Sequence, residues 1–245
     1  MKKSSLVVQG LQTEFRLRRY TVHAVNGVSY EIHPGEIVGV VGESGCGKSV
    51  SQMSVMRLIP EPPGHISAGT ALYNAHDLLH EEKNGPYLRS VRGAKIAMIF
   101  QEPMTSLNPV MRVGDQIAES IRLHLKLDRK EAKERAIDLM KRVRIPDAQE
   151  RYACYPHEFS GGMCQRIMIA MAMSCEPDIL IADESTTALD VTIQAQVLDL
   201  MQKLKEQYNT SMLMITHDLN VARKARRVVH IIDGELTEAE EATFA

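Results

Sequence analysis

The spacing of hydrophobic residues changes along this 245-residue chain, and each change predicts a different element. Within the first 33 residues, Val28, Tyr30 and Ile32 recur at every second position, which is typical of antiparallel strands with one buried face. A continuous apolar run, Ile37–Val41, indicates a buried strand. Between residues 113 and 143 the apolar positions follow a helical period instead. The chain therefore begins with β-structure and continues as a mixture of strands and helices.

Beyond residue 33 the predicted strands and helices alternate. Segment 65–93 is turn-rich and suggests more short strands, whereas Asp128 with Glu131 three residues later resembles the capping-box start of a helix. The other predicted elements are helix 49–58, strand 95–100, helix 162–174, strand 179–183, helix 192–207, strand 211–216, a short helix and strand 228–232. This alternation indicates an α/β fold with a mostly parallel sheet and helices on both faces. The helical stretch 113–158 is interpreted as an insertion into that core.

Charge and composition exclude several classes of protein. The chain has 29 Lys and Arg against 31 Asp and Glu, a formal net charge of −2, whereas a general nucleic-acid binder is usually basic. The longest apolar stretch, Ile167–Met173, is too short to span a membrane, and the start of the chain lacks a signal-peptide core. The four cysteines form no Cys-x-x-Cys pair, which argues against a zinc site. We therefore expect a protein on the cytoplasmic side without a nucleic-acid partner.

A glycine-rich segment follows the strand Ile37–Val41 and reads G-x-x-x-x-G-K-S. Glycines let the backbone curl until consecutive N–H groups point inward, and the helix that follows adds its partial positive end, so such a loop binds phosphates. Lys48 can reach the β- and γ-phosphates, and the Ser49 hydroxyl can ligate Mg²⁺. The alternative is a glycine-rich turn that matches by accident. The predicted nucleotide-binding residues here are Gly42, Glu43, Ser44, Gly45, Cys46, Gly47, Lys48, Ser49 and Val50.

Two further segments carry candidate chemistry. The strand 179–183 ends in Asp183 and is followed by Glu184, which places two carboxylates at the carboxyl edge of the sheet, where ligands of open α/β folds bind. The first acid can hold Mg²⁺, and the second can accept a proton from the attacking water; a solvated strand end is the simpler alternative. Ser160-Gly161-Gly162 begins another helix and is suited to an anion, or is simply a helix cap.

Taken in order, these segments resemble the nucleotide-binding subunit of an ABC transporter. Gly42–Ser49 resembles the Walker A loop, and Ile179–Asp183 with Glu184 resembles Walker B and its catalytic glutamate. The other matching positions are the Q-loop Gln101, the signature Phe159–Met163, the D-loop Asp190 and the switch His217. The resemblance implies a P-loop NTPase core with an N-terminal antiparallel β-subdomain and an inserted α-helical subdomain, about 113–158, in a single ATP-binding domain over residues 1–245.

The resemblance also implies an ATP hydrolase that requires Mg²⁺. Glu184 would be the general base, His217 would hold the γ-phosphate and the attacking water, and Lys48 would contact the phosphates. The implied Mg²⁺ ligands are Ser49, Gln101 and Asp183.

Family members work as head-to-tail dimers, so this chain is expected to pair with a second ABC ATPase subunit, either identical or related. Ser160, Gly161 and Gly162 of one subunit would complete the phosphate site of the other, and Asp190 would organise the interface. For the adenine, stacking on Phe15 is favoured and Tyr20 is the second choice. A core aromatic explains either residue equally well.

Longer strings are similar to the oligopeptide, dipeptide and nickel uptake branch of the family. They are residues 100–109, F-S-G-G-M at 159–163, and residues 186–196. This similarity implies an importer of peptides or a related small solute, with transmembrane permease subunits and, indirectly, a solute-binding protein as partners. The chain would then lie at the cytoplasmic face of the inner membrane as a peripheral subunit. The alternatives are a regulatory ABC subunit with little hydrolysis and a soluble ABC ATPase outside transport.

Ser185 and Cys164 are among the positions that depart from the family pattern. Ser185 stands where proline is usual after the catalytic glutamate, which predicts slower hydrolysis without loss of ATP binding. Cys164 stands where arginine or another polar residue usually follows the signature, which predicts weaker contacts across the dimer.

Overall fold

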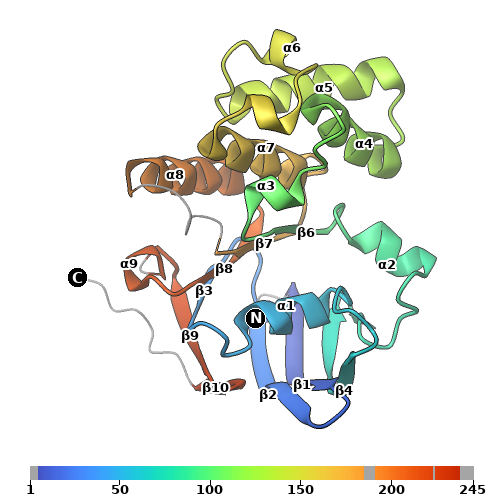
Figure 1. Cartoon of the computed structure of the whole chain (residues 1–245), viewed down its shortest axis with the longest axis vertical. Helices are drawn as coiled ribbons and strands as arrows, with labels where there is room; N and C mark the ends of the chain where they lie inside the picture. The colour runs from blue at the N-terminus through green and yellow to red at the C-terminus, as the bar shows by residue number, and fades with distance from the viewer. Residues whose placement is uncertain (1–4, 185–190, 223, 238–245) are drawn as a thin grey trace. The chain divides into compact units, whose positions relative to one another are not determined.

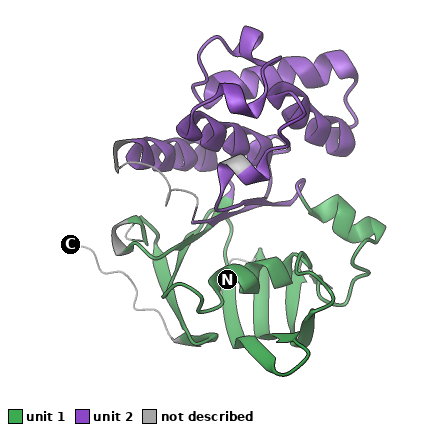
Figure 2. Ribbon diagram, viewed as in Figure 1, with its two compact units in different colours: residues 1–92, 211–245 green, residues 93–210 purple. Residues whose placement is uncertain are grey.

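The structure is a computed structural model, and it describes residues 5–184, 191–222 and 224–237 (Figure 1). The chain divides into two compact units, shown in different colours in Figure 2. Unit 1 comprises residues 1–92 and 211–245, and unit 2 comprises residues 93–210. The inserted helical segment 113–158 thus lies wholly within unit 2.

Unit 1 contains a four-stranded antiparallel sheet in the order β2-β1-β4-β5 (Figure 1). Its strands are β1 (Leu6–Arg16), β2 (Thr21–Ile32), β4 (Gly64–Tyr73) and β5 (His76–Asp77). The predicted alternation is confirmed, because Val28, Tyr30 and Ile32 are all buried along β2. Tyr30 pairs with Val8 and Ile32 with Leu6 of β1, so apolar side chains of both strands share one face.

Helix α1 (Lys48–Val55) lies across the buried face of this sheet (Figure 1). Buried hydrogen bonds join them: Ser54 Oγ lies 2.8 Å from Thr13 Oγ1, and the Tyr30 hydroxyl donates to Gln52 Oε1 at 2.6 Å. Burial raises the pKa of Tyr30 above its usual value, although the bond to Gln52 opposes that shift. Because each buried polar group is paired, the contact fixes where α1 lies on the sheet.

The remaining strands of unit 1 form a second set, in the order β10-β9-β3-β8. The parallel strands are β3 (Ile37–Val41), β8 (Ser211–Thr216) and β9 (Arg227–Ile232); β10 (Glu235–Thr237) returns antiparallel to β9. β3 pairs with β8 on one side and β9 on the other, which explains its continuous apolar sequence. Strand β10 and helix α2 (Pro86–Val91) were not predicted, and α2 corrects the expectation of strands alone in segment 65–93. Between β8 and β9 lies the short helix α9 (Leu219–Ala222).

Unit 2 combines two parallel strands with helices. Its strands are β6 (Ile96–Ile99) and β7 (Ile179–Asp183). Its helices are α3 (Pro103–Ser106), α4 (Val113–Leu125), α5 (Arg129–Arg142), α6 (Ala148–Arg151), α7 (Gly161–Met173) and α8 (Val191–Tyr208), with a 3-10 turn at Pro156–Glu158. In the part of the chain that is described, none of the helices is long and apolar enough to cross a membrane.

The helical stretch 113–143 contains two helices, α4 and α5. Lys126 has φ of 58°, a left-handed conformation that ends α4. The predicted capping box then begins α5, because Asp128 accepts hydrogen bonds from the N–H groups of Lys130 and Glu131, while Glu131 Oε2 accepts from the Asp128 N–H.

The loop between β3 and α1 is held by backbone groups from three other segments of unit 1. Gly47, with φ of 98°, lies so close to the Ala24 carbonyl of β2 that a Cβ would overlap with it. A Cβ on Gly42 would overlap with the Ile231 carbonyl of β9. The Gly234 N–H donates to the Cys46 carbonyl at 3.1 Å. The loop therefore has little space in which to change its shape.

This packing predicts different costs for alanine at two glycines of the loop. Gly47→Ala combines a left-handed backbone with overlap on the Ala24 carbonyl, so we expect it to lower the free energy of unfolding by about 3 kcal/mol or more. Gly45 also has a left-handed φ, 83°, but no described atom lies within 4 Å of an added Cβ, so Gly45→Ala should cost only about 1 kcal/mol. Urea denaturation of the two variants measures the difference. Equal losses would contradict the described packing of the loop.

Candidate nucleotide-binding site

In unit 1 the Lys48 side chain folds back over the loop that precedes it. Its Nζ donates to the carbonyl oxygens of Gly42 at 2.8 Å and Glu43 at 2.6 Å, and lies 3.7 Å from Cys46 Sγ. Only 4% of Lys48 is exposed. A buried ammonium in the curve of a glycine-rich loop attracts an anion, and phosphate oxygens can replace the carbonyl groups as its acceptors.

The start of α1 is built to receive an anion. Gly47 occupies the N-cap position, no described side chain caps the helix, and the first turn contains no acidic residue. The N–H groups of a first helical turn lack acceptors within the helix, and the helix dipole favours negative charge there. Ser49 and Val50 belong to that turn, and their contact with phosphate stays a prediction.

His217 leaves the same edge of the strands as the glycine-rich loop. Val41 of β3 pairs with Thr216 of β8 in a parallel register, and the next residues are Gly42 and His217. The Thr216 hydroxyl accepts a hydrogen bond from the Asp218 N–H at 3.0 Å, which fixes the turn after β8. Residues after the carboxyl ends of neighbouring parallel strands lie close together, so His217 comes near the glycine-rich loop. Its role as the switch histidine stays a prediction.

In unit 2 the structure brings Gln101 and Glu184 into contact across 83 positions of sequence. The amide Nε2 of Gln101 donates to Glu184 Oε2 at 2.8 Å. Their proximity follows from the register of β6 and β7, since Ile99 pairs with Ala182 and each functional residue comes two positions later. Glu184 has φ of 41°, a left-handed conformation that is uncommon for a residue with a side chain and recurs at functional sites.

The side chains predicted to hold a metal are suited to Mg²⁺. Asp183 ends the buried strand β7 and is only 5% exposed. Because Gln101 uses its amide nitrogen for Glu184, its amide oxygen is the atom left to face a cation. Both are oxygen donors, which hard divalent cations prefer, and in unit 1 the Ser49 hydroxyl is an oxygen donor as well.

The predicted signature segment starts α7. Ser160 is the N-cap, and its hydroxyl accepts a hydrogen bond from the Met163 N–H at 3.4 Å. A Cβ on Gly161 would meet no described atom within 4 Å, so this face of the helix start is open, whereas a Cβ on Gly162 would lie 3.0 Å from Ile193 of α8. The first glycine thus leaves room for a ligand, and the second allows close helix packing.

Cys164 faces the interior. It is 0% exposed, its thiol donates to the Pro156 carbonyl at 3.5 Å, and burial raises its pKa. A fully buried thiol does not reach the surface of the subunit, and the effect of Cys164 on contacts across the dimer stays a prediction. Ser185 and Asp190 lie outside the described residues.

The two candidate adenine-stacking residues occupy different positions in unit 1. Phe15 is half-buried near the end of β1, with its ring edge beside Gly64 of β4. Tyr20 precedes β2 and is 61% exposed. Stacking of either ring on adenine stays a prediction.

Sequence reasoning missed the groups that hold the loop in place. The Asn26 N–H donates to the Gly234 carbonyl at 2.7 Å, and the Gly234 N–H donates to Cys46, so the turn at Asp233-Gly234 links β2 to the loop. One signal was available, since an Asp-Gly pair between two apolar runs is typical of a hairpin. The Tyr30–Gln52 bond has no comparable signal.

Comparison with known proteins gives consistent results. Residues 25–187 match the family model described as ABC transporter. A Brucella melitensis protein named as a peptide import ATP-binding protein is 51% identical over 240 residues, which cover 96% of this chain and 70% of that protein. The dipeptide transport ATP-binding protein DppD of Bacillus subtilis is 48% identical over 234 residues, with coverage of 95% and 69%.

The fold also matches solved structures. A dimeric ATP-binding cassette bound to ADP and Pi superposes with a TM-score of 0.86 at 24% identity, covering 98% of this chain and all of that one. Its fold, a P-loop NTPase core of mixed α/β structure, is therefore the fold of this chain. The chain belongs to the ABC transporter family, as a nucleotide-binding transport ATPase of the branch whose curated members are ATP-binding proteins of peptide import.

Proposed function

We propose that this chain is the ATP-hydrolysing subunit of an importer for peptides or a related small solute, with nickel as an alternative cargo. One observation supports ATP hydrolysis and not only ATP binding: the 2.8 Å hydrogen bond from Gln101 to Glu184, the residue after Asp183. A regulatory subunit that only binds ATP would not need a carboxylate held in this way. The names of the curated relatives support the peptide assignment.

The contacts of the chain with the phosphates of its own nucleotide would come from unit 1. The first-turn N–H groups of α1 and the Lys48 ammonium would hold the β- and γ-phosphates and neutralise their charge. Ser49, Asp183 and Gln101 would hold Mg²⁺, which supplies further charge neutralisation and orients the phosphates. The carbonyl groups of Gly42 and Glu43 keep Lys48 directed into the loop.

Hydrolysis then requires an oriented water and a base. The Glu184 carboxylate would accept a proton from water as the water oxygen attacks the γ-phosphorus and the bond to the β-phosphate oxygen breaks. Gln101 would orient that carboxylate through its amide N–H. His217 would donate a hydrogen bond to the γ-phosphate and keep the attacking water in line.

The open start of α7 supports a dimeric mechanism. Ser160, Gly161 and Gly162 would bind the γ-phosphate held by a second subunit, because the helix start favours an anion and no described atom lies within 4 Å of an added Cβ on Gly161. Asp190 would organise that interface. We propose that the partner is a second copy of this chain or a related ABC ATPase subunit.

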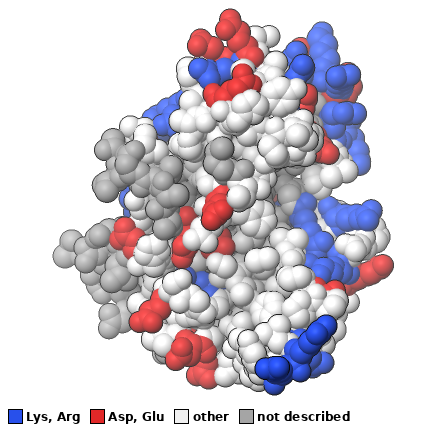
Figure 3. Space-filling view, in the orientation of Figure 1, with Lys and Arg blue, Asp and Glu red and all other residues white. Residues whose placement is uncertain are grey.

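A groove in unit 2 is our candidate for the permease contact. It has a volume of about 510 Å³ and lies among α4, α5 and α6. Its lining comprises Met111, Arg112, Asp115, Ala118, Glu119, Arg122, Arg129, Lys133, Tyr152 and Ala153. Figure 3 shows Lys and Arg side chains gathered over the α4 and α5 part of unit 2. The four cations outnumber the two carboxylates, so the groove suits an acidic segment of a transmembrane subunit.

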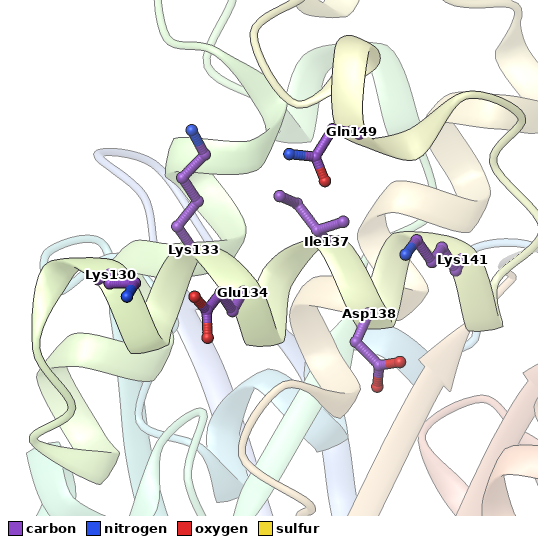
Figure 4. A pocket seen from close by; sticks show the side chains of 7 residues that line it. All are labelled: Lys130, Lys133, Glu134, Ile137, Asp138, Lys141 and Gln149. Carbon is purple, nitrogen blue, oxygen red and sulfur yellow. The ribbon is translucent and has the colours of Figure 1, made fainter.

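A second hollow in unit 2 lacks these features. It lies between α5 and Gln149 of α6, and Figure 4 shows the charged side chains of Lys133 and Asp138 pointing in opposite directions from α5. Lys130, Glu134 and Asp138 mix both signs of charge there, as expected of a solvated helix face. Docking at the first groove would place the chain at the cytoplasmic face of the membrane, with a solute-binding protein as an indirect partner and no nucleic acid.

Glu184→Gln tests the catalytic assignment. The amide cannot accept the proton from water, so we expect ATP turnover to fall by about 100-fold or more while the affinity for ATP changes little. Phosphate release and equilibrium binding of ATP, both with Mg²⁺, measure the two effects. Glu134→Gln on the exposed face of α5 is the matched control and should retain full turnover. Unchanged turnover in Glu184→Gln would remove Glu184 as the base.

Charge reversal in the groove tests the permease contact. Arg122→Glu with Arg129→Glu should abolish the stimulation of turnover by co-reconstituted permease and leave the basal rate unchanged, because neither residue belongs to the nucleotide site. Lys130→Glu, an exposed neighbour outside the groove, is the control. Equal stimulation of all three proteins would place the contact elsewhere on the chain.

A further inference from the structure

Helix α7 buries an amide without hydrogen bonds. Gln165 is 0% exposed, and within the described structure neither its Nε2 nor its Oε1 has a hydrogen-bond partner. The other buried glutamines are paired. Gln52 bonds to Tyr30 and Ser51, and Gln116 bonds to the backbone of Asn108 and Met111. Gln165 is thus an exception among the buried glutamines of the described residues.

An apolar side chain would be more favourable than an amide at this position. A buried amide that forms no hydrogen bond loses its contacts with water and gains nothing in return, whereas Leu or Met of similar volume loses nothing. The described conformation of α7 therefore does not account for a glutamine here. A second conformation, in which the amide is paired, would account for it.

The position of Gln165 links it to the start of α7. It lies four residues after Gly161 and three after Gly162, which places all three on one side of the helix. The helix also contacts α8 here, since a Cβ on Gly162 would lie 3.0 Å from Ile193 of α8. Arg166, the residue after Gln165, donates to Gln196 of α8 at 2.8 Å. A shift of the helix start along α8 would therefore move Gln165 as well.

We propose that Gln165 is a positioning residue whose amide is paired only when the start of α7 is placed to bind phosphate. The unpaired amide raises the free energy of the described conformation and so favours the second one. This inference rests on the proposed function only in its second half, the coupling to phosphate. The first half, an unpaired amide, is a property of the chain alone.

The variant Gln165→Leu in the full chain tests the unpaired amide and its coupling to phosphate separately. Removing an unpaired amide should raise the melting temperature by about 3 °C. It should also lower kcat about tenfold with little change in the KM for ATP, because the second conformation loses its hydrogen bonds while α1 and Lys48 are untouched. If Gln165 only filled space in the core, its replacement would not raise the melting temperature and lower kcat together.

Gln116→Leu is the matched control. It makes the same substitution at a buried glutamine of unit 2 that is fully bonded, so its melting temperature should fall. Changes of opposite sign in the melting temperatures of the two variants support an unpaired amide at Gln165. A lower melting temperature for Gln165→Leu as well would overturn the proposal, since the amide would then be bonded in the described conformation.

A raised melting temperature with unchanged kcat would also overturn the proposal. If the wild-type chain binds ATP without turnover, the proposed function fails, and the readout becomes ATP-induced dimerisation measured by light scattering. Gln165→Leu should then weaken the dimer about tenfold relative to wild type, and an unweakened dimer would reject the coupling.

Discussion

The whole nucleotide site depends on how closely backbone groups approach the loop between β3 and α1. Phosphate is bound by N–H groups that point inward, and such a curl persists only when its neighbours leave no alternative shape. Here the carbonyl groups of Ala24 and Ile231 press against Gly47 and Gly42, and the turn at Gly234 bonds to Cys46. These contacts come from β2, β9 and the β9–β10 turn. The shape of the predicted phosphate-binding loop therefore depends on several strands of unit 1. The eight residues of the motif, Gly42–Ser49, do not fix that shape alone.

The same reasoning explains which parts of the fold the sequence could predict. Strands β7 and β8 begin and end where the apolar runs predicted, because a strand buried on both faces has no other composition. Short elements were missed: α2, α3 and β10 are too brief to show a period. The capping box at Asp128 predicted the start of α5, but the end of α4 was missed, since Lys126 carries no helix-breaking side chain and takes its left-handed conformation from its surroundings.

The candidate site divides in a similar way. Glycine, lysine and carboxylate positions are recognisable in sequence because their chemistry allows few substitutes. The contact of Gln101 with Glu184 is not, since it depends on the register of Ile99 against Ala182. Sliding either strand by one residue would turn one of the two side chains to the opposite face of the pair. Sheet register is therefore as much a part of the proposed catalytic group as the residues themselves.

The glutamines of this chain differ in how many ends of the amide form hydrogen bonds, and this separates those that hold the fold from those with a proposed role in the mechanism. Gln52 and Gln116 use both ends of the amide to fix one arrangement of neighbouring elements, so they add to the rigidity of α1 and α4. Gln101 uses one end on Glu184, which leaves the other for a ligand. Gln165 uses neither. Because an amide is neutral, it can change partners without the large cost of moving a buried charge, and this makes glutamine a suitable residue where a helix must occupy two positions.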